Sequence, residues 1–130
     1  MTMKNTMMKM FAAAAVLGLS LVPAAAQEFR AGNFPMQSGE AIYKGVCQGC
    51  HMPDAKGAVG AGRYPALAGD SNLAVAGYPI GIILHGQKAM PWFNEYFSDQ
   101  QVANVVNYVR THFGNHYTDK VTAADVKALR

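Results

Sequence analysis

The feature that most constrains this chain is the string CQGCH, in which Cys47 and Cys50 flank two residues and His51 follows directly. The chain has 130 residues and only these 2 cysteines. On a helical turn, residues three apart face the same side, so the two thiols point together while the imidazole projects beside them. The fold must therefore present two thiols and one imidazole to a single site.

This motif has four candidate chemistries. A disulfide between Cys47 and Cys50 would close so short a loop that it removes little entropy from the unfolded chain. A thioredoxin-like dithiol requires a βαβ context, and no stretch of this sequence alternates convincingly as a strand. Zinc commonly takes a second ligand pair at metal spacing, and no second cysteine pair exists. The motif therefore favours one covalently bound haem c, with thioether bonds from both cysteines and its iron bound by His51.

The first 26 residues predict a cleaved secretory signal peptide. Lys4 and Lys9 form a basic start, residues 11–22 form a short apolar run, and three alanines end at Ala26 as a small-residue cleavage site. The apolar run stops at a proline, short of the roughly 20 residues that a membrane-spanning helix needs. We expect export to the periplasm by the general secretory route, cleavage of residues 1–26, and no stable membrane insertion after cleavage.

Removal of 26 residues from the 130-residue chain leaves 104, which suits one small domain. Residues 27–37 show no periodicity and are expected as an N-terminal segment leading into a monohaem domain at 38–130. A domain of this size buries only a marginal core unless an additional covalent link or bound group stabilises it. Loss of Lys4 and Lys9 lowers the Lys and Arg count from 11 to 9 against 8 acids, so the formal charge is +1. This balance argues against a nucleic-acid partner.

The mature sequence predicts an all-α fold of three to five helices wrapped around the haem. Ser38 is the expected N-cap of a first helix that ends in the motif. On that helix five residues recur at spacings of three and four and are expected to share one face. They are Ile42, Tyr43, Val46, Cys47 and Cys50. Residues 52–69 and 87–97 are rich in turn-forming residues and are expected as long ordered loops.

Three further helices are expected. Asp70 or Ser71 is a candidate cap for a short helix near 72–77, and Pro79 is a candidate start for a helix that runs to Gly86. The strongest helix signal is a capping box at Ser98 and Gln101 followed by an apolar stripe that Gly114 ends. The stripe consists of Val102, Val105, Val106, Val109 and Phe113. Thr122 is the expected cap of a last short helix that carries Val126 and Leu129.

Met90 is the expected second axial ligand of the iron. Five of the 8 methionines lie in the leader, which leaves Met36, Met52 and Met90. Met52 adjoins His51 and is unable to reach the opposite face of a haem, and Met36 precedes the helix that carries the thiols. Met90 lies in a loop outside any apolar stripe and precedes a proline that stiffens its backbone. A vacant position or a histidine ligand remains as the alternative.

Three other histidines are rivals for that position. His85 is five residues before Met90, and we expect it to be a hydrogen-bonding or surface residue beside the haem crevice. His112 and His116 follow the strongest predicted helix, where a cationic side chain meets the negative end of the dipole. We expect both at the surface.

These residues resemble the class I c-type cytochromes, and more narrowly the cytochrome c subunits and electron acceptors of bacterial periplasmic dehydrogenases. The similarity extends over roughly residues 38–130. It rests on GEAIYKGVCQGCH, YPALAG (64–69), PIGIILHG (79–86), AMPWF (89–93) and SDQQVANVVNYVRTHFGN with its trailing VTAADVKALR.

The resemblance implies further roles for individual residues. Gly39 and Tyr43 are expected to cross the last long helix near Tyr108. Pro65 is expected to accept a hydrogen bond from His51 through its carbonyl oxygen, and Leu67 to pack on the haem. Related subunits often carry three haem domains and an anchor, whereas this chain has one motif, so we expect a soluble carrier.

With both axial positions filled by protein, we expect one-electron transfer rather than enzyme catalysis. The expected donor is a periplasmic dehydrogenase, either a flavoprotein or a quinoprotein, and the expected acceptor is a terminal oxidase or another cytochrome of the respiratory chain. One alternative is a tightly bound cytochrome subunit of a flavocytochrome-type dehydrogenase complex. A less favoured alternative is a haem enzyme or ligand sensor in which Met90 is labile.

Overall fold

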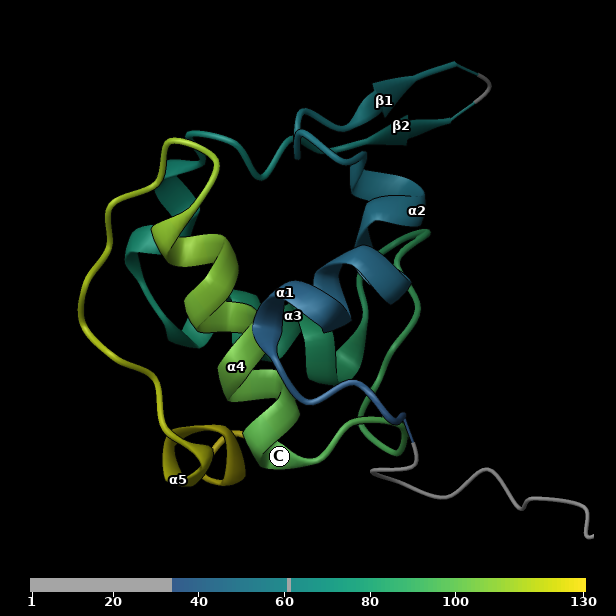
Figure 1. The fold of residues 1–130 in the computed structure, drawn as a ribbon. Coiled ribbons are helices and arrows are strands. Elements are labelled where there is room, and N and C mark those ends of the chain that lie inside the picture. The colour runs from purple at the N-terminus through teal and green to yellow at the C-terminus, as the bar shows by residue number, and fades with distance from the viewer. Residues whose placement is uncertain (1–33, 61) are drawn as a thin grey trace, which may run out of the picture.

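The computed structural model describes residues 34–60 and 62–130. The expected signal peptide at 1–26 lies outside the described residues, as does most of the segment at 27–37. None of the helices within the described ranges has the length and apolar character of a membrane span. In chain order the elements are α1 (Gly39–Ile42), the π-helical turn η1 (Tyr43–Cys47), α2 (Gln48–His51), β1 (Ala58–Val59), β2 (Arg63–Tyr64), the 3-10 helix η2 (Ser71–Ala74), α3 (Gly77–His85), α4 (Asp99–Thr111) and α5 (Ala123–Lys127) (Figure 1).

One continuous helical segment carries the CQGCH motif. Ser38 caps it as expected, since its hydroxyl oxygen accepts a 3.1 Å hydrogen bond from the Ala41 amide. Between α1 and α2 the helix widens into the π-helical turn η1, which the sequence pattern did not predict. Four of the five residues that were expected to share one face lie in the core or pack against it, namely Ile42, Tyr43, Val46 and Cys47. Tyr43 is buried, whereas Cys50 is exposed.

The first helix crosses α4 at close range (Figure 1). Gly39 permits this approach, because a Cβ atom there would lie 2.1 Å from the Asn104 carbonyl oxygen and 2.6 Å from the Cβ atom of Tyr108. The rings of Tyr43 and Tyr108 pack in the same crossing with their centroids 5.8 Å apart. The helix crossing that the resemblance implied is therefore confirmed.

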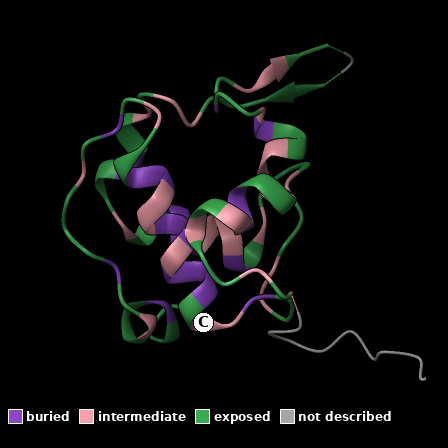
Figure 2. Ribbon diagram, in the orientation of Figure 1, coloured by how far each residue is buried: buried purple, intermediate pink, exposed green. Residues whose placement is uncertain are grey.

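Helix α4 supplies the centre of the core and is buried along one face (Figure 2). Its N-terminus has the predicted capping box, in which Ser98 and Gln101 exchange side-chain to backbone hydrogen bonds. The predicted stripe is buried except for Phe113, which lies beyond the helix and has a φ of 59°. The buried members are Val102, Val105, Val106 and Val109.

A small antiparallel hairpin interrupts the predicted loop at 52–69. Strands β1 and β2 pair so that Ala58 faces Tyr64. The expectation of no strand is therefore wrong at this point. Each strand has 2 residues, which is too short for alternation to be visible in a sequence. The described part remains mainly helical, in agreement with the all-α class.

The short helices before the next loop begin earlier than predicted. Asp70 caps η2, but this turn spans residues 71–74 and not 72–77. Helix α3 begins before Pro79 rather than at it. Proline is tolerated throughout the first turn, because the amides there need no partner within the helix. Gly86 ends α3 as predicted, with a φ of 72°.

The last short helix, α5, is capped by Thr122 as predicted. Thr122 and Asp125 form a second capping box. Val126 is fully buried, whereas the side chain of Leu129 is 44% exposed. Only the first of the two expected apolar residues therefore enters the core.

Candidate haem-binding site

The two cysteines stand at the junction of η1 and α2 as free thiols. Cys47 is half-buried and Cys50 is exposed. Burial raises the pKa of the Cys47 thiol to about 12, whereas an activated dithiol has a lowered thiol pKa. The structure therefore supports neither the disulfide nor the thioredoxin-like interpretation of the pair.

His51 is the last residue of α2, and only 8% of its surface is exposed. Its Nδ1 atom lies 3.0 Å from the Pro65 carbonyl oxygen. A carbonyl oxygen only accepts hydrogen bonds, so the neutral ring carries its proton on Nδ1 and its lone pair on Nε2. This tautomer makes Nε2 the atom that is able to bind a metal.

The chain reverses sharply after His51. Met52 has a φ of 67° and a ψ of 158°, a region that residues other than glycine rarely occupy. The hydroxyl of Tyr43 donates a 2.8 Å hydrogen bond to the Met52 carbonyl oxygen. Burial raises the pKa of this hydroxyl to about 12, so it stays protonated. The amide of Gly57 donates a 3.0 Å hydrogen bond to the His51 carbonyl oxygen, and the two bonds together fix the backbone beside the imidazole.

Pro65 and Leu67 lie in the segment after β2. The Leu67 amide donates to the Ala55 carbonyl oxygen at 2.7 Å, and the Leu67 carbonyl oxygen accepts from Nδ2 of Asn115 at 2.8 Å. Asn115 is 2% exposed and also donates to the Val109 carbonyl oxygen at 2.8 Å. Asn115 thus supports this segment from the turn that follows α4. The sequence analysis missed it because an asparagine after a glycine has the pattern of an ordinary turn.

The Met90 loop, residues 86–97, joins α3 to α4. The amide and the carbonyl oxygen of Met90 both pair with Gln87, at 2.9 and 3.1 Å. A Cβ atom on Gly86 would lie 2.8 Å from the Met90 carbonyl oxygen, so the loop folds back directly on the end of α3. These contacts hold the backbone of Met90 against the end of α3, while its side chain is half-buried.

The other three histidines are exposed. Nε2 of His85 lies 3.3 Å from the Leu129 carbonyl oxygen, so it carries a proton in this arrangement. The ring of His112 stacks on that of Tyr108 with their centroids 4.1 Å apart. His85 is thus a hydrogen-bonding residue, and His112 and His116 lie at the surface, as expected.

The donor set fits haem c better than a bare metal ion. Within residues 34–60 and 62–130, no three or more His, Cys, Asp or Glu side chains gather as a metal site, so the zinc interpretation finds no support there. Two free thiols on one turn and an imidazole with Nε2 available match the donors that haem c requires. The fold brings Cys47, Cys50, His51 and Pro65 together, whereas Met90 belongs to a separate loop.

Several known proteins are similar to this chain in sequence. The family described as "Cytochrome C oxidase, cbb3-type, subunit III" matches residues 34–109. The "Alcohol dehydrogenase (quinone), cytochrome c subunit" of Komagataeibacter europaeus is 35% identical over 122 residues, which cover 83% of this chain and 25% of that protein. The "Fructose dehydrogenase cytochrome subunit" of Gluconobacter japonicus is 34% identical over 107 residues, or 71% of this chain and 22% of that protein. The "Gluconate 2-dehydrogenase cytochrome c subunit" of Pantoea cypripedii is 35% identical over 112 residues, or 72% and 24%.

The helical fold, the CQGCH turn and the matched sequence define a class I c-type cytochrome. The chain belongs to the family whose description is cytochrome c oxidase, cbb3-type, subunit III. Its cofactor is covalently bound haem c with its iron. The chain spans about a quarter of the length of the curated relatives named above.

Proposed function

We propose that this cytochrome is a periplasmic one-electron carrier that accepts electrons from a flavin- or quinone-dependent dehydrogenase and passes them to the respiratory chain. The observation that carries the proposal is the 3.0 Å contact between Nδ1 of His51 and the Pro65 carbonyl oxygen, because it engages Nδ1 and leaves Nε2 for iron. Relatives named as cytochrome subunits of alcohol, fructose and gluconate dehydrogenases support a dehydrogenase as the donor. The acceptor is a terminal oxidase or another cytochrome.

Each site residue has one task in this proposal. Cys47 and Cys50 would hold the haem through thioether bonds, and His51 and Met90 would bind its iron through Nε2 and Sδ. The haem supplies an iron that takes up and releases one electron. The Pro65 carbonyl oxygen, 3.0 Å from Nδ1, fixes the orientation of the imidazole and increases its basicity.

Two further features suit electron transfer. With His51 and Met90 as ligands, the iron would have no position for oxygen or a substrate, and the thioether of Met90 would raise the reduction potential. Leu67 is half-buried among the core residues, and we assign it the role of keeping water from the haem. The role of this chain is therefore electron transfer, and the dehydrogenase performs the catalysis.

The periplasmic location rests on residues 1–26, whose pattern is that of a cleaved leader. Cleavage after Ala26 leaves residues 27–37 as a lead-in to the cytochrome domain at 38–130. Mass spectrometry of the protein recovered from the periplasm tests this part of the proposal. The expected N-terminal residue is Gln27, and recovery of the uncleaved chain from the membrane fraction would contradict it.

A redox titration combined with carbon monoxide binding tests the function. A carrier titrates as a one-electron couple, is reduced by a substrate-reduced quinoprotein or flavoprotein dehydrogenase, and binds carbon monoxide slowly in the ferrous state. The Met90→Ala variant is the control, because it opens one iron position and should bind carbon monoxide fast. Fast and tight binding by the unsubstituted protein would instead identify a haem enzyme or ligand sensor.

A second candidate is a tightly bound subunit of a flavocytochrome-type complex, because the matched relatives are themselves named as subunits. Size-exclusion chromatography of a native extract separates the two candidates. A carrier elutes at the size of one small domain, whereas a subunit co-elutes with dehydrogenase activity.

A further inference from the structure

The residues after α5 contact both ends of the Met90 loop. At the first end, His85 is the last residue of α3 and donates from Nε2 to the Leu129 carbonyl oxygen at 3.3 Å. At the second end, the guanidinium of Arg130 reaches the segment 94–99. Two consecutive residues therefore hold the start and the end of the loop that carries Met90.

Arg130 makes most of these contacts. Its Nε donates to Oδ1 of Asp99 at 2.8 Å, and its Nη1 donates to Oδ1 of Asn94 at 2.6 Å and also to the Asn94 carbonyl oxygen. Its Nη2 donates to the Phe97 carbonyl oxygen at 3.0 Å. The planar, rigid fork of a guanidinium suits such a set of acceptors, which a lysine ammonium is unable to match.

The ion pair between Arg130 and Asp99 is better shielded from water than the two described ion pairs that join residues close in sequence. The side chains of Arg130 and Asp99 are 26% and 27% exposed. The corresponding fractions are 60% and 56% for Lys44 and Glu40, and 75% and 58% for a pair in the loop after α2. Exposed pairs contribute little because water and salt screen them. We therefore expect the contacts of Arg130 to stabilise the structure more than those two exposed ion pairs do.

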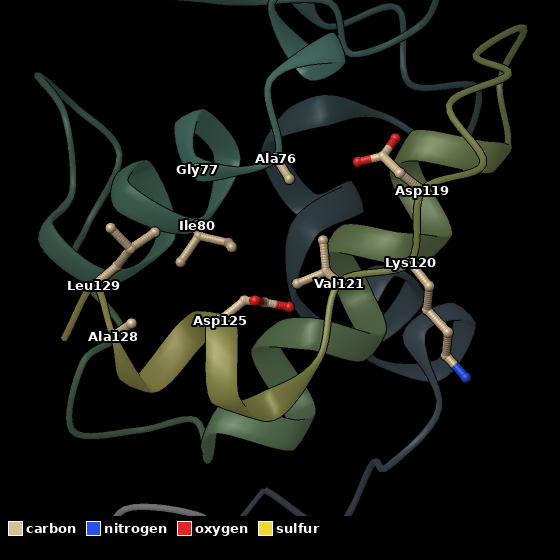
Figure 3. A pocket seen from close by; sticks show the side chains of 9 residues that line it. All are labelled: Ala76, Gly77, Ile80, Asp119, Lys120, Val121, Asp125, Ala128 and Leu129. Atoms are coloured by element: carbon tan, nitrogen blue, oxygen red, sulfur yellow. The ribbon is translucent and has the colours of Figure 1, made fainter.

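A pocket of about 400 Å³ that is open to solvent lies between α3, α5 and the segment before α5 (Figure 3). Ile80 of α3 and Leu129 are among the residues that line it, and Leu129 is 44% exposed. The hydrogen bond between His85 and Leu129 therefore joins α3 to the residues after α5 at the edge of this pocket.

Met90 is attached to the first end of the loop, and the residues that follow it are attached to the second end. The backbone of Met90 pairs with Gln87, and the Phe93 amide donates to the Ile83 carbonyl oxygen at 2.9 Å. The amide of Phe97 donates to the Phe93 carbonyl oxygen at 3.1 Å, and the rings of these two residues stack with their centroids 5.2 Å apart. The position of Met90 therefore depends on both ends of the loop, and Arg130 holds the second end through the Phe97 carbonyl oxygen.

We propose that Arg130 is a positioning residue for Met90, which holds the C-terminal end of the Met90 loop so that the thioether stays on the iron. The His85 to Leu129 bond is the matching attachment at the other end. The inference rests on the proposed ligation of iron by Met90. It assigns to the residues after α5 the control of how often that ligand leaves.

The test is the rate at which imidazole binds to the ferric holoprotein, because imidazole enters only when Met90 has left. Arg130→Met should raise this rate by about tenfold or more, since it removes several hydrogen bonds to a charged group. Arg130→Lys keeps the charge but lacks the fork, so its rate should also rise. Lys127→Met removes a charge from α5 without any described ion pair, and its rate should equal that of the unsubstituted protein.

The outcomes separate this inference from the proposed function. A far-red sulfur-to-iron absorption band in the unsubstituted ferric protein, together with equal imidazole rates in Arg130→Lys and Lys127→Met, would overturn the inference and leave Met90 ligation intact. Absence of the band in the unsubstituted protein would overturn both. Denaturant unfolding of the same variants provides the second measurement, and a purely structural role predicts that imidazole rates rise only in proportion to lost stability.

Discussion

At the scale of single residues, Gly39 determines how closely α1 approaches α4. There is no space for a side chain at Gly39, because a Cβ atom on this residue would lie 2.1 Å from the Asn104 carbonyl oxygen. Backbone is unable to move aside as a flexible side chain does, so the helices themselves must separate when this residue is enlarged. The crossing positions Tyr43, whose hydroxyl holds the turn beside His51.

Gly39→Ala should lower the free energy of unfolding by about 1–3 kcal/mol, the usual range for overpacking a tight contact. Denaturant unfolding of the holoprotein measures the change. Gly81→Ala is the matched control, because Gly81 lies within α3 and has nothing within 4 Å of the added Cβ atom. The control should be neutral or more stable by roughly 0.5–1 kcal/mol. Equal losses in the two variants would show that the crossing is not tight.

Met52 is the second residue with a direct physical consequence. Its φ of 67° and ψ of 158° lie where a side chain is disfavoured by about 1–3 kcal/mol. Met52→Gly should therefore be more stable than Met52→Ala by about 1 kcal/mol, because both lose the same side chain and only glycine relieves the backbone. Thermal unfolding of the two variants checks this, and an alanine variant as stable as the glycine variant would contradict it.

Local chemistry explains which residues the sequence predicted correctly. Ser38, Ser98 and Thr122 were identified as caps because a cap involves only neighbouring residues. Met52 and Asn115 were missed, because their conformation and contacts depend on segments far away in the chain. The contact between the Pro65 carbonyl oxygen and Nδ1 of His51 is confirmed. The haem-binding roles of Cys47, Cys50, His51, Met90 and Leu67 stay predictions from motif and resemblance.

At the scale of elements, one buried arginine ties the segment after α4 to the rest of the fold. Arg110 is fully buried, and its guanidinium donates to the Leu73 carbonyl oxygen at 2.8 Å and to the Asp119 carbonyl oxygen at 2.6 Å. It also donates to Oδ1 of Asp119 at 2.7 Å. Helix α4 thereby anchors both η2 and the segment that leads to α5.

The same contact predicts a pH dependence. The hydrogen bond from Arg110 holds the pKa of Asp119 below its usual value of 3.8. A lowered pKa in the folded state contributes stability above the unfolded pKa, and this contribution is lost as the pH falls through the folded pKa. Asp119→Asn should therefore be less stable than the unsubstituted protein at neutral pH, and the difference should shrink below about pH 4.

Chemical unfolding at a series of pH values measures this difference. Glu95→Gln is the control, because Glu95 is exposed and has no described ion pair. A deficit of Asp119→Asn that persists unchanged at low pH would show that the carboxylate charge is not responsible.

Elements differ in how well a sequence predicts them. Helix α4 was predicted because 13 residues allow the apolar pattern to repeat. The π-helical turn η1 and the hairpin of β1 and β2 were not, because each is too short to show a period. At η1 the side chain of Met36 lies against Gly45, where a Cβ atom would be 2.8 Å from Cε of Met36.

At the scale of the whole molecule, the haem is part of what makes a chain of this size fold. With the proposed cleavage after Ala26, 104 of the 130 residues would remain, and a domain of this size buries a marginal core. Cys47, Leu67 and Met90 are each half-buried. A covalently attached apolar cofactor supplies the missing core and joins it to the first helix.

Loss of the haem should therefore abolish cooperative folding. The variant with both Cys47→Ser and Cys50→Ser is expected to lose most of the helical circular dichroism and to show no sharp thermal transition. Gln48→Ala lies between the two cysteines and keeps both thiols, so it serves as the control and should unfold cooperatively. A sharp transition in the double serine variant would show that the polypeptide core suffices.

The most direct test of the account is the absorption spectrum of the ferric protein, because a sulfur-to-iron band in the far red reports a methionine ligand. The account predicts this weak band in the unsubstituted protein and in Met52→Ala, and its loss in Met90→Ala. Absence of the band from the unsubstituted protein, or its survival in Met90→Ala, would contradict ligation of the iron by His51 and Met90.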